Sequence, residues 1–236
     1  MKEIKALDKG FVRLVEAMAS DEGVVRAARV SYAGTTKGEA KDRELITYLL
    51  KHQHLTPFEH AVFKFHVKCP IFVARQWFRH RWSSYNEISF RYTETSEEFY
   101  VPERWRAQDR KNRQGSVAAD LDDAALTRTY RESLEQSYRA YKDLIDAGVA
   151  REMARMALPV ALYTEFFWTV NARSLINYLS LRADAHAQIE IQAYAEALAA
   201  FFEQLMPWTY EAFLQNLWKG ENAKFAARKE KACAKH

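Results

Sequence analysis

The strictest pattern in this chain is an alternation of apolar and polar side chains over residues 61–68. Successive side chains of a β-strand point to opposite faces of the sheet. One face of this run is entirely apolar and comprises Ala61, Phe63, Phe65 and Val67, whereas the positions between them are mostly Lys and His. The run therefore predicts a half-buried strand with its aromatic face against the core.

Helical periodicity surrounds this strand. The predicted helices cover 40–54, Pro70 to about Phe78, 126–145 with Gly148 as C-cap, 150–158 before Pro159, Asn171 as N-cap through Leu181, and 187–205 before Pro207. A capping box with Thr56 as N-cap, Pro57 at N1 and Glu59 at N3 predicts another helical turn. A second strand is predicted over 162–170. Because strands and helices do not alternate as βαβ units, we expect a single-domain α+β fold.

Two segments lack such patterns. Residues 103–123 are rich in Arg, Gln and Asp, so we expect a mobile loop there. Residues 219–236 hold six basic and two acidic side chains, which accounts for the whole net charge of +4. We expect them to form a solvated, fraying tail behind a domain of residues 1–218. That domain is formally neutral, unlike proteins that bind the many phosphates of a nucleic acid.

The composition narrows the setting of the protein. With 48% hydrophobic residues the chain can bury a sizeable core. No run approaches the roughly 20 apolar residues of a membrane span, and the charged N-terminus does not resemble a signal peptide. Cys69 and Cys233 lie far apart, without a CxxC motif. We therefore expect a cytoplasmic protein with no disulfide framework, no cysteine-based zinc site and no membrane partner.

Residues 79–92 carry most of the chemistry. The segment interleaves three arginines, one histidine, three serines, one asparagine and one glutamate with four aromatic residues. A guanidinium binds phosphate through a planar fork, while hydroxyl, amide and carboxylate groups hydrogen-bond to sugars and bases. The composition favours a ligand that is anionic at one end and planar at the other, such as a nucleotide. A solvated loop with ion pairs remains an equal alternative on composition alone.

The spacing of this segment resembles the signature of flavin-dependent thymidylate synthases, RHRxxSxNExSxRY. All nine fixed positions match, namely Arg79, His80, Arg81, Ser84, Asn86, Glu87, Ser89, Arg91 and Tyr92. Residues 52–60, 74–78, 171–174, 181–184 and 186–188 also resemble family blocks, and the similarity covers most of residues 1–218.

The resemblance implies FAD-dependent methylation of dUMP to dTMP, with 5,10-methylenetetrahydrofolate as one-carbon donor and NADPH as reductant of the flavin. It also implies a homotetramer whose chains fold as helices around an antiparallel-rich sheet and share their active sites. The implied FAD contacts are His54, Thr56, Arg79, His80, Arg81, Glu87, Asn171, Arg173 and Asn177. The implied dUMP contacts are Gln76, Arg79, Glu87, Ser89, Arg91, Arg155 and Arg182.

Several of these residues also have plainer interpretations. Arg173 lies beside the expected helix N-terminus, where anions bind, but it could equally form a surface ion pair. The resemblance assigns Arg182 the activation of dUMP through N3, whereas a helix-terminal arginine often binds carbonyl groups. No metal site is expected, because the histidines and Glu59 of residues 54–60 do not have the HExxH spacing.

Cysteine placement bears on the mechanism. Folate-only synthases activate uracil with an enzyme cysteine. Here Cys69 ends a predicted strand and Cys233 lies in the tail, so a route with a flavin hydride and no cysteine nucleophile fits better. Two other functions stay open: an NADPH oxidoreductase that does not alkylate uracil, and a module that binds single-stranded nucleic acid through its arginines and aromatic residues.

Overall fold

A five-stranded sheet forms the centre of the computed structural model, which describes residues 2–32, 34 and 36–234. The strand order is β1-β2-β3-β7-β4, and every neighbouring pair is antiparallel. The strands are β1 (Lys2–Ala6), β2 (Gly10–Met18), β3 (Val62–Pro70), β7 (Tyr163–Asn171) and β4 (Ser84–Glu87). This antiparallel sheet confirms the α+β class.

The alternating run forms the middle of the sheet. β3 pairs with β7 over its full length, from Val62 opposite Asn171 to Pro70 opposite Tyr163. Phe63, Phe65 and Val67 are fully buried, whereas the intervening Lys and His side chains are only half-buried. Both predicted strands are therefore confirmed, and their apolar side chains form one face of the core.

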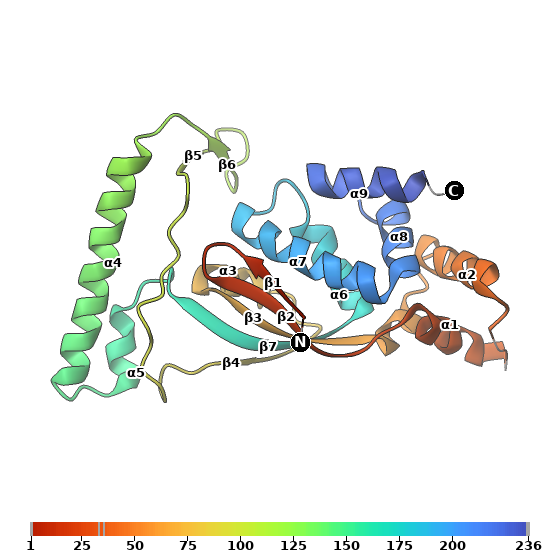
Figure 1. Cartoon of the computed structure of the whole chain (residues 1–236), viewed down its shortest axis with the longest axis horizontal. Coiled ribbons are helices and arrows are strands. Elements are labelled where there is room, and N and C mark those ends of the chain that lie inside the picture. The colour runs from red at the N-terminus through yellow and green to blue at the C-terminus, as the bar shows by residue number, and fades with distance from the viewer. Residues whose placement is uncertain (1, 33, 35, 235–236) are drawn as a thin grey trace.

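Helices cover this apolar face (Figure 1). α6 (Ala172–Arg182) follows β7 directly, and α7 (Ile189–Leu205) packs beside it. α3 (Ile71–Trp77) extends from β3, with Pro70 as its N-cap residue, as predicted. α1 (Asp21–Arg29), α2 (Glu39–Lys51), the 3₁₀ turn η1 (Val30–Tyr32) and α8 (Pro207–Asn216) gather at one end of the sheet. The main hydrophobic core lies between these helices and the sheet.

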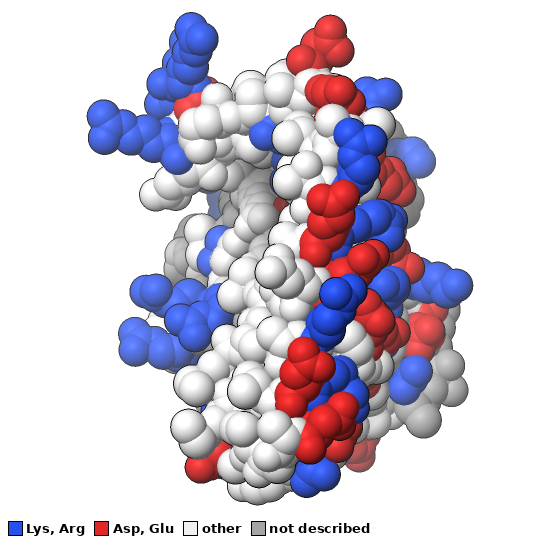
Figure 2. All heavy atoms as spheres, turned by 90° about the vertical axis from the view of Figure 1, so that its left-hand side faces the viewer, with Lys and Arg blue, Asp and Glu red and all other residues white. Residues whose placement is uncertain are grey.

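A second, smaller hydrophobic cluster lies at the opposite end of the sheet and comprises the buried residues Phe99, Leu134, Ala161 and Leu162. α4 (Asp123–Asp146) stands there beside α5 (Arg151–Ala154) and the 3₁₀ turn η3 (Arg155–Ala157). Gly148 follows α4 with a φ of 83°, as expected of a glycine that ends a helix. Figure 2 shows acidic and basic side chains alternating down the outer side of α4. This side therefore offers no uniformly basic track of the kind that follows a nucleic-acid backbone.

The predicted turn at Thr56 is present, but its capping box is wrong. η2 (Thr56–His60) is a 3₁₀ turn whose N-cap is Leu55, with no side-chain capping bond. The Glu59 carboxylate instead accepts from the Arg173 guanidinium, with Nη1 2.5 Å from Oε1. An ion pair to α6 has taken the place of the local cap.

Residues 103–123 contain more structure than a loop. β5 (Arg106–Gln108) pairs with β6 (Ser116–Ala118) in a short hairpin. Arg106 Nη2 donates to the buried carboxylate of Glu190 at 2.8 and 3.1 Å, which attaches the hairpin to the first turn of α7. The mobility of this segment stays a prediction.

The expectation of a fraying tail is wrong for the described part of residues 219–236. Residues Ala223–Cys233 form α9, with Asn222 as its N-cap. Phe225 and Ala232 are buried, and Arg228 Nη1 donates to Tyr210 Oη of α8 at 3.1 Å. Lys235 and His236 lie outside the described residues. The apolar residues of the tail pack against α8 and Trp218, and two of its basic residues, Arg228 and Lys229, are half-buried and donate to Tyr210 and to the Trp218 carbonyl. Within the described ranges, no helix is long and apolar enough to span a membrane.

Candidate functional site

A tight turn leads the chain from α3 into β4 and carries the first residues of the signature. His80 N–H donates to the Trp77 carbonyl at 3.0 Å. Ser83 Oγ and Tyr85 Oη both donate to the His80 carbonyl, at 2.8 and 2.7 Å. Tyr85 Oη also lies 3.2 Å from the Trp77 carbonyl. Backbone and side-chain bonds thus fix the position of His80.

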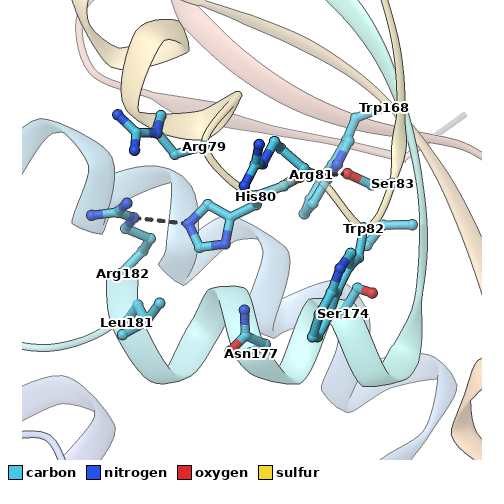
Figure 3. A pocket seen from close by; sticks show the side chains of 11 residues that line it. Arg79, His80, Arg81, Trp82, Ser83, Trp168, Ser174, Asn177, Leu181 and Arg182 are labelled. Carbon is cyan, nitrogen blue, oxygen red and sulfur yellow. Dashed lines mark hydrogen bonds between the residues drawn. The ribbon is translucent and has the colours of Figure 1, made fainter. Parts of the chain in front are cut away.

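The opposite wall of the site comes from α6. Asn171 is its N-cap, as predicted, and its side chain accepts from Ser174 N–H at 2.9 Å. The helix then places Asn177, Leu181 and Arg182 on the side that faces the 79–83 turn (Figure 3). A strand followed directly by a capped helix therefore brings residues a hundred positions apart in sequence to one place.

Turn and helix enclose a cavity of about 340 Å³. Its lining residues are Arg79, His80, Arg81, Trp82, Ser83, Trp168, Val170, Ser174, Asn177, Leu181 and Arg182. Three of them are arginines, and none carries a carboxylate. Arg79 and Arg81 are exposed, whereas Arg182 is half-buried. A cavity with several cations, no acidic side chain and an apolar wall suits an anionic ligand with a planar part.

Arg182 does not bind helix carbonyls, which was the plainer interpretation of this residue. Its Nε donates to His80 Nε2 at 3.0 Å, as the dashed line in Figure 3 shows. Burial, and then the positive charge of Arg182, lower the pKa of His80 from 6.5 to about 4. His80 is therefore neutral at pH 7, with Nε2 as an acceptor.

Of the other predicted FAD contacts, His54, Thr56, Asn171 and Arg173 lie near the N-terminal end of α6, whereas Glu87 lies at the end of β4 and does not line the cavity. η2, which begins at Thr56, packs against this helix, and exposed His54 lies just before it. Arg173 forms an ion pair with Glu59, which is the contact expected if this residue is a surface ion-pair partner and not an anion-binding group. The Arg173 guanidinium also lies 5.7 Å from the ring centroid of Trp82, which lines the cavity. The 79–82 turn and the start of α6 thus form one continuous surface.

The predicted dUMP contacts are not all brought together. Gln76 hydrogen-bonds to Gln188, the N-cap residue of α7. Glu87, at the end of β4, accepts from Thr164 Oγ1 at 2.7 Å. Ser89, Arg91 and Arg155 lie outside the cavity; Arg91 and Arg155 are exposed. Within this chain, Arg79 and Arg182 are the two predicted dUMP contacts that share the cavity.

The sequence interpretation missed the apolar wall. Trp168 and Val170 of β7 and Leu181 of α6 line the cavity, and Trp82 is 70% exposed beside them. Trp82 and Tyr85 occupy positions that the signature leaves free, so the motif does not mark them. Trp168 lies in the strand predicted over 162–170, to which no site residue was assigned, and it is fully buried as well as lining the site.

The two cysteines lie apart from this cavity. Cys69 is fully buried in β3, and burial, followed by the charge of Glu87, raises its pKa well above 9.0. Cys233 is exposed at the end of α9. In the part of the chain that the structure describes, no three His, Cys, Asp or Glu side chains could together hold a metal ion.

Comparison with known proteins identifies the family to which this chain is related. The family model described as "Thymidylate synthase complementing protein" matches residues 13–208. A flavin-dependent thymidylate synthase of Thermosipho africanus is 55% identical over 222 residues, which are 93% of this chain and 97% of that protein. The chain belongs to the flavin-dependent thymidylate synthase family. The match to the family model includes both walls of the cavity and ends before α9.

Other relatives agree. A flavin-dependent thymidylate synthase of Thermus thermophilus is 52% identical over 217 residues, covering 92% of this chain and 80% of that one. The structure of PolB from Streptomyces cacaoi, a UMP/dUMP methylase bound with 5-Br dUMP, superposes with a TM-score of 0.81 at 38% identity. The superposition covers 89% of this chain and 97% of PolB. This chain therefore shares nearly its whole fold with a nucleotide methylase.

Proposed function

We propose that this chain methylates dUMP to dTMP, with bound FAD, 5,10-methylenetetrahydrofolate as one-carbon donor and NADPH as reductant. Family membership and the likeness to a UMP/dUMP methylase support the reaction. One observation of this structure links the proposed reaction to particular residues. Arg79 and Arg81 of the signature and Arg182 of α6 surround one cavity that no carboxylate lines.

The residues present fit a flavin dinucleotide. Arg79 and Arg81 are exposed guanidinium groups that can bind a pyrophosphate, and the start of α6 adds the N-terminal N–H groups that favour anions. The exposed face of Trp82 and the apolar wall of Val170 and Leu181 suit a planar ring. When bound, FAD supplies the hydride that turns a methylene group into a methyl group.

Arg182 is the residue that we assign to the chemistry. Uracil becomes nucleophilic at C5, and can attack a one-carbon unit, when negative charge develops on its N3–C4–O4 edge. A guanidinium held at that edge stabilises the charge without titrating itself. Because Nε already donates to His80, the terminal N–H groups of Arg182 are the ones left for the pyrimidine.

We further propose that the working enzyme is a homotetramer with shared active sites. Ser89, Arg91 and Arg155 lie outside the cavity of their own chain, and Arg91 and Arg155 are exposed. In our proposal these side chains complete the dUMP site of a neighbouring chain. A cavity of about 340 Å³ lies near the lower end of the range for small-molecule sites, roughly 300–1,000 Å³, and leaves part of so large a cofactor to be held elsewhere.

The test is an absorption spectrum of the purified protein followed by product analysis. We expect a flavin spectrum, and dTMP from dUMP only when methylenetetrahydrofolate and NADPH are both supplied. UMP should be run beside dUMP, since the structural relative is described as acting on both. NADPH oxidation without dTMP would instead support the oxidoreductase. A colourless protein that FAD cannot restore, and that binds oligonucleotides in a salt-dependent way, would support the nucleic-acid module.

A further inference from the structure

Arg182 is one of three long, flexible arginine side chains that line the cavity, so its position must be fixed by other groups if it is to act on one ligand atom. It is the last residue of α6, where the following backbone leaves the helix. An arginine side chain has several rotatable bonds and roughly 2 kcal/mol of rotamer entropy to lose when it is ordered. Among the residues that the structure describes, the hydrogen bond of this guanidinium runs from Nε to His80 Nε2, at 3.0 Å.

His80 is well suited to hold another side chain. Its backbone carbonyl accepts from Ser83 Oγ and from Tyr85 Oη, and its N–H donates to Trp77. Its ring lies 4.7 Å from the ring of Tyr178, which is fully buried. Tyr178 is on α6, one turn before Arg182, so the imidazole is fixed against the same helix that carries the arginine.

The bond also sets the protonation of the ring. A guanidinium has only N–H donors, so Nε2 must be without a proton and the single ring proton lies on Nδ1. The charged groups that line the cavity with His80 are Arg79, Arg81 and Arg182, all of them cations. Burial and the charge of Arg182 lower the pKa of His80 and so oppose an imidazolium, which could no longer accept from Arg182.

We propose that His80 is a positioning residue for Arg182: the neutral imidazole holds the Nε–H group, so that the two terminal nitrogens of the guanidinium face the pyrimidine. This role is additional to any contact of His80 with the flavin, because it uses Nε2 and leaves the Nδ1–H group available. The proposal rests on the function assigned above to Arg182.

Two substitutions at one position separate the two ring nitrogens. In His80→Gln the amide oxygen can lie close to the place of Nε2 and accept from Arg182. In His80→Asn the shorter side chain reaches only the place of Nδ1 and leaves Arg182 without its acceptor. Both amides are neutral at all relevant pH values, and both lose the aromatic contact with Tyr178, so they form a matched pair.

The measurements are kcat at saturating FAD and dUMP, the dissociation constant of dUMP, the FAD content and the melting temperature. We expect His80→Asn to lose roughly 10- to 100-fold in kcat or dUMP affinity, as for a lost hydrogen bond to a charged group, and His80→Gln to recover most of that loss. FAD content and melting temperature should be similar in the two variants. Equal losses in both, or losses that saturating FAD removes, would overturn the positioning role.

A double-mutant cycle on dUMP affinity completes the test. If His80 acts through Arg182, then His80→Asn should weaken dUMP binding in the wild-type background but add little to the loss that Arg182→Ala already causes. Additive losses would show that His80 acts independently of Arg182 and would contradict the proposal. Wild-type enzyme run in parallel separates this result from the wider one, because failure of the wild type to form dTMP refutes the proposed function itself.

Discussion

Replacement of Arg182 by alanine should separate chemistry from folding. The guanidinium is half-buried at the C-terminal end of α6, and its contact in the structure is the one to His80. Arg182 is not part of the main hydrophobic core, to which this helix contributes the fully buried Leu175 and Leu179. The truncated side chain would leave space that opens to the cavity, where water can replace the lost N–H groups.

The expected cost to stability is small. A cation in the last turn of a helix contributes about 0.3–1 kcal/mol through the helix dipole. The hydrogen bond to His80 adds an amount of the same order, since both partners can be solvated once the arginine is gone. Turnover should respond far more strongly, because loss of a group that stabilises charge in the transition state typically lowers kcat roughly 100- to 1,000-fold.

The assay is dTMP formation at saturating dUMP, combined with FAD content and thermal unfolding of the same preparation. Arg182→Lys is the matched control: it keeps the positive charge at the helix end but lacks both the Nε–H group and the planar fork. We expect both variants to hold FAD and to melt near the wild type, with Arg182→Ala the slower enzyme. Turnover of Arg182→Ala within a few-fold of wild type would refute the assignment.

Three further predictions follow from other parts of the molecule. The pKa of His80 is about 4 in the folded chain and 6.5 in the unfolded chain, so the unfolded chain binds the proton more readily. The free energy of unfolding should therefore fall by about 1–2 kcal/mol, after allowance for partial exposure, as the pH drops from 6.5 towards 4. Urea unfolding across this pH range should show a smaller fall in His80→Gln. Cys69→Ala and Cys233→Ala, alone and together, should retain substantial dTMP synthesis, and loss of turnover in a folded, FAD-loaded variant would restore a covalent cysteine mechanism. Phe225→Ala should lower the free energy of unfolding by up to about 3–5 kcal/mol in urea titrations, because this side chain is 0% exposed; an unchanged value would mean that α9 does not pack in solution.

Sequence periodicity predicted the elements whose side chains follow one rule over many residues. β3 has a strict alternation, α4 has a long apolar stripe, and α6 begins at a capping asparagine, so each was predicted close to its observed bounds. β4 was not predicted, because its four residues serve two purposes. They pair with the edge of β7 and also belong to the signature, so polar side chains hide the strand pattern.

The tail shows the opposite error. Its charge suggested solvent exposure, yet Phe225 and Ala232, seven residues apart, lie on one helix face and are both buried. The convergence of Arg79, Arg81 and Arg182 could not be derived from spacing either. It depends on how α6 folds back from β7 towards the 79–83 turn, which only the packed structure shows. The family resemblance supplied these residues, and the structure supplied the link between Arg182 and His80.

The source of the hydride distinguishes this account from every alternative. Enzyme with reduced FAD would be mixed, without oxygen or NADPH, with dUMP and methylenetetrahydrofolate. We predict that dTMP forms in an amount equal to the flavin that becomes oxidised, and that the folate is recovered as tetrahydrofolate, because the flavin and not the folate has given up the hydride. Formation of dTMP with dihydrofolate while the flavin stays reduced, or no dTMP at all, would contradict the account.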